Sequence, residues 1–244
     1  VGLWKDVGGV LTKVVQTGDA APGLGAGVFF DDIQSLPGID GSGDIVFHAN
    51  LRGTGITAGT NDRTIWKEGG GVLTLVAQGG DAAPEAGAGA VFTFVNRPST
   101  NDTGRVAFTA GLTGTGVTTA NDTGAWLDVG NGLELIVREG DAVPGLVGIN
   151  LGNPFAPVLN GLGRAALTAT LTGLGVDSSN DQALIAESPF GSPSVVVRTG
   201  DVVEVTAGDF RTVAQVLFNG GFNDSGELAF GLIFTGGSRG LFVS

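Results

Sequence analysis

The residues best suited to chemistry are aspartates in the first fifth of the chain. Asp31 and Asp32 precede the segment Asp40-Gly-Ser-Gly-Asp44, and spaced carboxylate oxygens are ligands that calcium prefers. The segment lacks the bidentate glutamate that closes an EF-hand loop, and it stands where a turn between strands is expected. We therefore interpret Asp40 and Asp44 first as turn residues. All four aspartates are retained as candidate calcium ligands.

A second set of carboxylates follows glycine at regular intervals. Its members are Asp19, Asp81, Asp141 and Asp201. Four equivalent turns could each offer oxygen ligands to calcium. Aspartate at a turn also accepts hydrogen bonds from nearby backbone N–H groups, and a residue present in every copy of a repeat usually serves the scaffold. We interpret these aspartates as turn caps.

Nucleophilic and redox chemistry has little support in the composition. The chain has no cysteine and one histidine, His48, which excludes disulfides, thiolate nucleophiles, zinc–cysteine sites and paired-histidine metal motifs. No G-x-S-x-G elbow, Walker loop or dinucleotide fingerprint occurs. Two of the 24 acidic residues could converge as a glycosidase pair, but no spacing selects them. We therefore predict a protein that is not an enzyme and has no cofactor other than calcium.

Tryptophan recurs at equivalent positions and could stack on sugars. Trp4, Trp66 and Trp126 each stand at the centre of a short apolar segment. Ile185 and Phe242 occupy the corresponding positions later in the chain, so ring-specific recognition is not required there. We interpret the tryptophans as repeated core residues.

The overall composition limits the class of protein. Of 244 residues, 42% are hydrophobic and 15% are charged, which is too apolar for a disordered chain. The net charge of −12 disfavours a nucleic-acid partner. No apolar run of about 18 residues occurs, so we expect no membrane span. Because the first residue is Val1, we expect a processed or excerpted product.

The elements that carry these residues form a repeat. Four copies of about 61 residues are visible, approximately at 1–61, 62–121, 122–180 and 181–244, within a single repeat domain spanning 1–244. Each copy opens with a short strand that has a bulky centre, followed by a β-rich run that ends at the Gly-Asp pair. Each copy later contains a turn of the form Asn-x-x-Gly that leads into another strand.

This second marker carries a family resemblance. The motif Asn-x-x-Gly-x-x-Ala-Phe is complete at Asn101, Gly104, Ala107 and Phe108, and again at Asn223, Gly226, Ala229 and Phe230. The other two copies depart from it, with Asp40 and Val46 in the first and Leu167 in the third. The chain thus resembles the extracellular tandem-repeat proteins named for the NxxGxxAF motif. The resemblance implies a bacterial secreted or surface-attached protein, often with a variable C-terminal anchor, and it implies no catalytic residues.

The repeat predicts an all-β architecture. About four short strands per copy, separated by glycine-rich turns, match the arithmetic of a β-propeller blade. A β-solenoid and a β-sandwich are the alternatives.

One strand is in surplus. The bulky opening strand occurs a fifth time at the C-terminus, so Leu241, Phe242 and Val243 correspond to the segment around Leu3 and Trp4. This strand could close a propeller within the chain, which we expect first, or pair with a neighbouring molecule and give a filament. The function predicted is an extracellular or cell-surface structural or adhesive protein that associates with itself or with other surface or matrix components. The alternative is a monomeric propeller-type module that binds a glycan or calcium.

Overall fold

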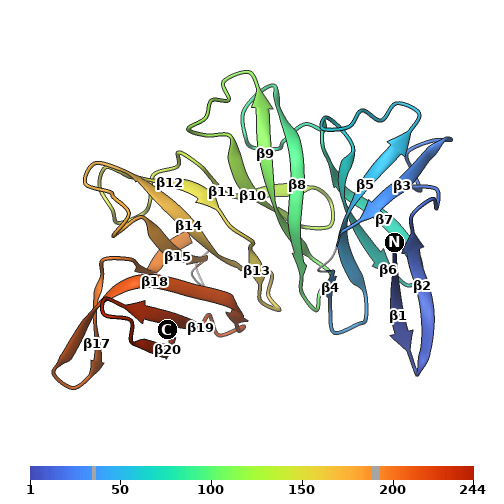
Figure 1. Cartoon of the computed structure of the whole chain (residues 1–244). Coiled ribbons are helices and arrows are strands. Elements are labelled where there is room, and N and C mark those ends of the chain that lie inside the picture. Colours follow the sequence, from blue (N-terminus) through green and yellow to red (C-terminus); the bar gives the residue numbers. More distant parts are fainter. Residues whose placement is uncertain (35–36, 188–192) are drawn as a thin grey trace.

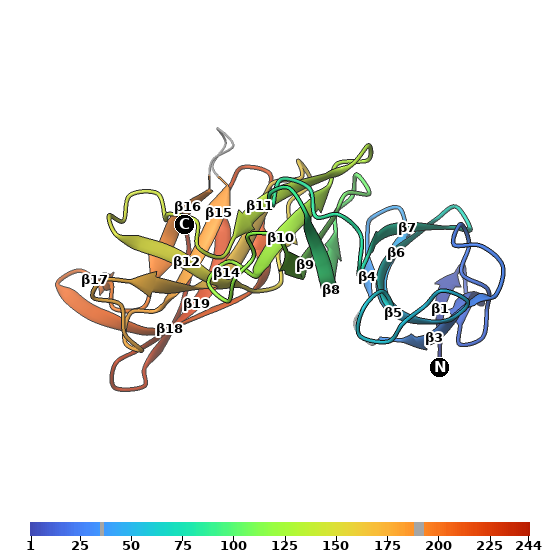
Figure 2. The same cartoon turned by 90° about the horizontal axis from the view of Figure 1, so that it is seen from above.

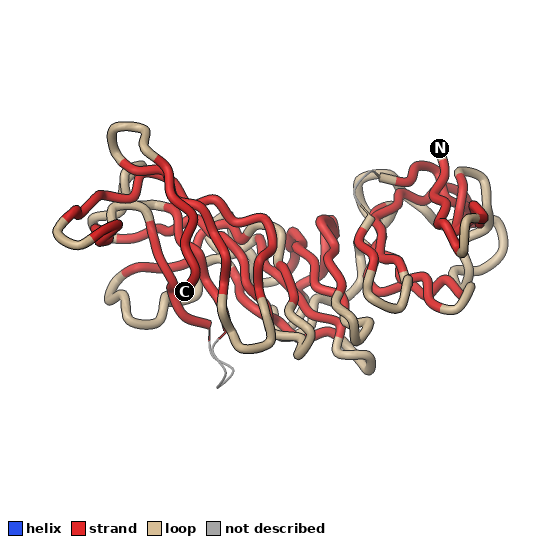
Figure 3. Tube along the Cα trace, turned by 90° about the horizontal axis from the view of Figure 1, so that it is seen from below, coloured by secondary structure: helices blue, strands red, loops and turns tan. Residues whose placement is uncertain are grey.

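The protein is an all-β chain. The computed structural model describes residues 1–34, 37–187 and 193–244, and these residues form strands, turns and loops with no helix (Figure 3). The all-β expectation is therefore confirmed. The described residues contain no helix that is long and apolar enough to cross a membrane.

The strands form a hairpin and four small antiparallel sheets that follow one another along the chain (Figure 1). The N-terminal hairpin consists of β1 (Gly2–Val7) and β2 (Val10–Gln16). The first sheet consists of β3 (Val28–Ile33), β4 (Gly38–Ile39), β5 (Ile45–Gly53), β6 (Arg63–Gly69) and β7 (Val72–Gln78), in the order β3-β5-β6-β7 with β4 also beside β5.

The next two sheets repeat this plan. The second sheet consists of β8 (Ala90–Thr100), β9 (Val106–Gly114), β10 (Thr123–Asp128) and β11 (Leu133–Arg138). The third consists of β12 (Ile149–Pro154), β13 (Val158–Leu159), β14 (Ala165–Gly173), β15 (Gln182–Glu187) and β16 (Pro193–Arg198). The C-terminal sheet consists of β17 (Val202–Thr206), β18 (Asp209–Phe222), β19 (Leu228–Phe234) and β20 (Arg239–Val243).

Each of the first three sheets is built from two consecutive copies of the sequence repeat, whereas the strands of the C-terminal sheet all lie in the fourth copy. The copy boundary at residue 61 falls between β5 and β6, so the first sheet takes β3 to β5 from one copy and β6 and β7 from the next. The motif strand and the bulky opening strand therefore lie side by side in every sheet. Their register is the same in all four, with the pairs Phe47↔Trp66, Phe108↔Trp126, Leu167↔Ile185 and Phe230↔Phe242.

The N-terminal hairpin has the structure of the second half of a sheet. A register shift precedes the bulky residue at Leu3/Trp4, and the same shift occurs at Ile65/Trp66 and Ala125/Trp126. Among the described residues, β1 pairs only with β2, and no motif strand lies on its other side. The hairpin therefore corresponds to the last two strands of a sheet such as β10–β11.

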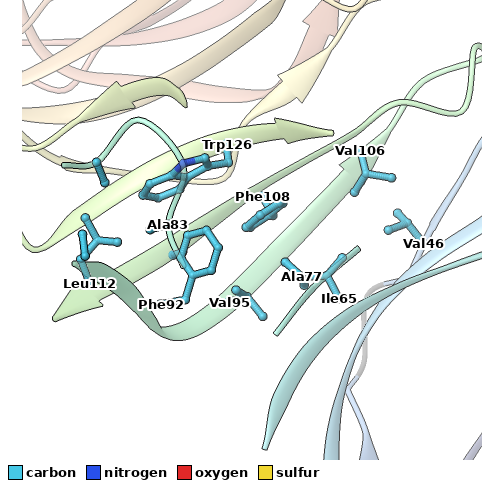
Figure 4. Close-up of a cluster of buried hydrophobic side chains, with 13 residues drawn as sticks. Val46, Ile65, Ala77, Ala83, Phe92, Val95, Val106, Phe108, Leu112 and Trp126 are labelled. Atoms are coloured by element: carbon cyan, nitrogen blue, oxygen red, sulfur yellow. The ribbon is translucent and has the colours of Figure 1, made fainter. Parts of the chain in front are cut away.

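The cores lie between successive sheets. Alternate side chains on each strand point to opposite faces, so Val46 and Ile65 leave the first sheet on its rear face and join the core that contains Val95 and Val106 of the second (Figure 4). We call the face of a sheet that looks toward the next sheet along the chain its rear face, and the face that looks toward the preceding sheet its front face. The same arrangement joins the second sheet to the third and the third to the C-terminal sheet.

The hairpin packs on the first sheet in the same way. Leu3 and Val15 join the core that contains Trp66. Lys5 of β1 forms an ion pair of 2.6 Å with buried Glu68, and the equivalent residue Lys67 approaches Asp128 of the second sheet at 3.7 Å. The hairpin is thus the first member of the same stack.

The stack is open. β20 pairs with β19 inside the C-terminal sheet, and the described strands form no closed propeller (Figures 1 and 2). Closure by the surplus strand, our first expectation, is therefore not what the structure has. The physical reason is register: β20 fills the place beside β19 that β6, β10 and β15 fill beside their own motif strands. The hairpin remains at the opposite end of the stack (Figure 1).

Candidate functional site

The C-terminal end of the stack exposes a face that is buried elsewhere. Leu241 is 92% exposed, whereas the equivalent residues Ile65 and Leu184 are fully buried by the sheet that follows. Ala229 is also exposed, although its equivalent Ala107 is fully buried. The rear face of the C-terminal sheet is thus an interior surface without its cover.

This face is hollowed. A groove of about 720 Å³ runs across the rear of β18, β19 and β20, and its walls include Leu217, Ala229, Leu241 and Val243. Val243 is 70% exposed, whereas its equivalent Leu127 in the second sheet is 7% exposed. Contiguous apolar surface of this kind marks an interaction site.

The N-terminal end shows the complementary defect. Trp4 is 47% exposed, whereas Trp66 and Trp126 in the same position are fully buried. The reason is the missing motif strand: Trp126 packs edge-on against Phe92 and stacks on Phe108, and no such rings lie beside Trp4.

Ile39 on β4 is exposed at the same end of the stack. It is 65% exposed, whereas its equivalent Leu159 is 7% exposed because Leu159 packs against Ala107 of the preceding sheet. A groove of about 680 Å³ lies between β1 and β4, with Trp4, Val7 and Ile39 among its walls. The sequence analysis did not identify Ile39, although alignment of the copies places it at the position of the buried residue Leu159.

Both ends carry the same local structure. The segments Gly2-Leu3-Trp4 and Gly240-Leu241-Phe242 share sequence, and in each the aromatic ring folds back over the glycine two residues earlier. The same fold-back occurs between Trp126 and Gly124. The predicted assembly residues Leu3, Trp4, Leu241, Phe242 and Val243 therefore lie at the two ends of the stack in equivalent strands.

The motif asparagines link the sheets in a ladder. The Asn101 amide donates to the Asn160 carbonyl at 2.8 Å, and the Asn160 amide donates to the Asn223 carbonyl at 3.0 Å. The side-chain oxygens of Asn101 and Asn160 also cap their own turns by accepting from Arg105 N and Arg164 N. In the first copy Asp40 caps its turn in the same way but has no amide to donate. The motif thus requires asparagine for a contact between copies.

We expect Asn160→Asp to lower the free energy of unfolding by about 2 kcal/mol, because Asn160 is 1% exposed and its donor would be lost. Asp40→Asn is the matched reverse change and should stabilise by about 1 kcal/mol, by supplying the missing donor toward Asn101. Denaturant unfolding of both variants measures the difference. If the two substitutions change the free energy of unfolding by the same amount and in the same direction, the hydrogen bonds between the asparagines do not contribute to stability.

The Gly-Asp turns are held as expected for capping residues. Asp19 accepts from Gln16 N at 3.0 Å, Asp141 from Arg138 N at 2.8 Å and Asp201 from Arg198 N at 2.9 Å. Asp81 occupies the equivalent turn of the second copy.

Three of the four calcium candidates use their carboxylates in local contacts, and Asp44 contributes its backbone N–H to one of them. Asp40 accepts from the backbone of Ser42 and Asp44, and Asp31 pairs with Arg52 at 3.0 Å. Asp32 accepts from Gln34. Across residues 1–34, 37–187 and 193–244, the structure brings together no group of three acidic or histidine side chains suited to a metal. Calcium binding thus remains a prediction from sequence.

His48 lies in a polar pocket of about 430 Å³ at the rear of the first sheet, lined also by Asn50, Arg63 and Arg97. Burial, reinforced by the charge of Arg63, lowers the pKa of His48 to about 4, so the imidazole is neutral at pH 7. His48 Nε2 and Asn50 Oδ1 are buried without a hydrogen-bond partner. The pocket has polar groups suited to a sugar, and glycan binding also remains a prediction.

The fold of the described residues defines a class: an open stack of small antiparallel β-sheets that begins with a hairpin. Residues 1–244 match DUF7453, described as a family of unknown function, and the chain belongs to that family. A comparison with curated proteins gives no match.

Proposed function

We propose that this protein is a non-enzymatic, extracellular structural or adhesive protein whose copies assemble head to tail into a filament. The observation that carries the proposal is the contrast in exposure between the ends and the interior. Leu241 and Ala229 at one end, and Trp4 and Ile39 at the other, are exposed where their equivalents are buried between sheets.

The two ends are different surfaces, so each can cover the other but not itself. Association of unlike surfaces is heterologous, and unless its rotation closes a ring it produces an open chain of subunits. Each junction would bring the hairpin β1–β2 of one copy against the C-terminal sheet of the next. The extracellular location is supported by the resemblance to the NxxGxxAF proteins.

The test is to block one end at a time. Ala229→Asp places a charge on the rear face of the C-terminal end, and Ile39→Asp places one beside the groove of the N-terminal end. Both positions are exposed in the monomer, so the fold should be unaffected. We expect wild-type protein to form polymers by light scattering and electron microscopy, and each variant alone to remain monomeric.

Mixing the two variants tests the polarity. Ala229→Asp keeps a working N-terminal end and Ile39→Asp keeps a working C-terminal end, so an equimolar mixture should stop at a dimer. Ala58→Asp, on an exposed turn, is the matched control and should polymerise like wild type. Wild-type protein that stays monomeric at every concentration, or variants that polymerise fully, would contradict the proposal.

A further inference from the structure

The place beside β19 has two candidate occupants. In the interior sheets the motif strand is followed by a two-stranded hairpin, such as β6–β7 beside β5. On the side of β19 away from β18, the described residues place the single strand β20 and no further strand beyond it. The N-terminal hairpin β1–β2 is the converse case, a complete hairpin without a motif strand.

β1 and β20 are equivalent strands, so they compete for one position. Phe242 pairs with Phe230 in the register that Trp66 and Trp126 use with their own partners. Trp4 stands in that position in β1, after the same Gly-Leu pair. A continuous stack across two molecules therefore requires β20 to leave.

We infer that copies join by strand exchange: the β1–β2 hairpin of a second copy displaces β20 and pairs with β19. This inference rests on the proposed head-to-tail assembly and specifies its mechanism. The occupant is a second copy of this chain, because the chain itself contains a hairpin with the required geometry. In β1–β2, as in β10–β11, the strand register shifts just before the tryptophan, and the tryptophan ring folds back over the glycine two residues earlier.

The exchanged register supplies partners to groups that lack them. Trp4 would lie opposite Phe230 and beside Phe234, the two rings that Phe242 contacts at centroid distances of 6.1 and 6.0 Å. Trp126 contacts two such phenylalanines of its own sheet, Phe92 and Phe108, and Trp66 contacts Phe30 and lies opposite Phe47 in the strand register. The exchange gives Trp4 the environment that the interior tryptophans already have.

A backbone donor at the sheet end would also gain a charged acceptor. Leu228 N donates to Ser244 Oγ at 3.0 Å, in the place where Ala165 N donates to the Glu187 carboxylate. Asp6 is the residue of β1 equivalent to Ser244 and Glu187. Exchange thus replaces a hydroxyl acceptor by a carboxylate, which forms the stronger hydrogen bond.

The hairpin that would enter is larger than the strand that would leave. β20 contributes five residues and one strand, whereas the hairpin contributes two strands already packed on the first sheet of its own molecule through Leu3 and Val15. When the hairpin of the second copy pairs with β19 of the first, β19 would lie in the groove between β1 and β4 of the second copy. Ala229 of the first copy would then contact Ile39 of the second, as Ala107 contacts Leu159 within the chain. Apolar side chains at both ends would leave water.

A reversible staple tests the displacement. The chain contains no cysteine, so Ala229→Cys with Val243→Cys introduces one defined pair across β19 and β20, directly opposed and exposed. Oxidation locks β20 in place, and we expect loss of polymer that returns on reduction. The matched control is Glu204→Cys with Phe210→Cys, opposed and exposed in the β17–β18 hairpin, and its oxidation should change nothing.

A second pair of variants separates exchange from simple contact. Phe242→Ser weakens β20, so it should allow polymers at lower protein concentration than wild type, whereas Trp4→Ser should abolish them. If wild type polymerises, and the oxidised staple also polymerises or Phe242→Ser prevents assembly, strand exchange is wrong while head-to-tail assembly stands. If wild type never polymerises, the proposed function itself fails.

Discussion

Replacement of Trp126 by alanine should lower the free energy of unfolding by about 3–5 kcal/mol, whereas the same change at Trp4 should lower it by less than about 1 kcal/mol. The two residues occupy equivalent positions in the repeat. Their predicted difference comes entirely from what covers them.

Trp126 is fully buried and makes specific contacts. Its ring lies edge-on to Phe92 at 5.0 Å, and its Nε1 donates to the Pro84 carbonyl at 3.0 Å. Truncation would leave a large cavity and an unpaired carbonyl. Trp4 is 47% exposed, so its truncation removes less buried surface and leaves no enclosed void.

Both substitutions should be made in the Ala229→Asp variant, which we expect to be monomeric. Trp4 is also proposed to lie at the junction between molecules, so assembly would otherwise add to the measured stability. Denaturant unfolding followed by far-ultraviolet circular dichroism gives the midpoints and slopes. Equal losses at Trp126 and Trp4 would show that Trp4 is buried in the monomer. That result would remove the main support for the N-terminal end as an assembly surface.

The repeat made much of the fold predictable. Four copies of a bulky strand, a β-rich run and an Asn-x-x-Gly turn correctly indicated an all-β chain, and the described residues contain no helix. The offset between copy and sheet was not predictable from spacing, because pairing of β5 with β6 across a copy boundary depends on contacts between strands rather than on order alone.

The candidate site was predicted only in part. The surplus strand drew attention to Leu241 and Trp4, which the structure places at the two ends. Ile39 was missed because its exposure results from the absence of a neighbour, and composition cannot report a missing neighbour. The link from Asn101 to Asn160 was also missed, since the local role of asparagine in its own turn explains the motif without any contact between copies.

A methyl group at Gly114 is expected to destabilise the protein by about 3–5 kcal/mol, through positive-φ strain and overpacking together. Gly114 ends β9 at φ +114°, and a Cβ atom there would overlap the Gly89 carbonyl oxygen. The equivalent residues Gly53 and Gly173 meet the carbonyls of Gly27 and Gly148 in the same way. Backbone atoms on both sides leave little room for relaxation.

Gly116 is the matched control, because its φ of +77° is also positive but a Cβ atom would meet nothing within 4 Å. Gly116→Ala should therefore lower the free energy of unfolding by about 1 kcal/mol, from backbone strain alone. Thermal and denaturant unfolding of the two variants separates strain from overlap. If both substitutions have the same effect, the close approach of β8 and β9 at this corner is not what selects glycine in three copies of the repeat. If Gly114→Ala is much the worse, the glycine excess of the chain is in part a packing requirement between neighbouring strands.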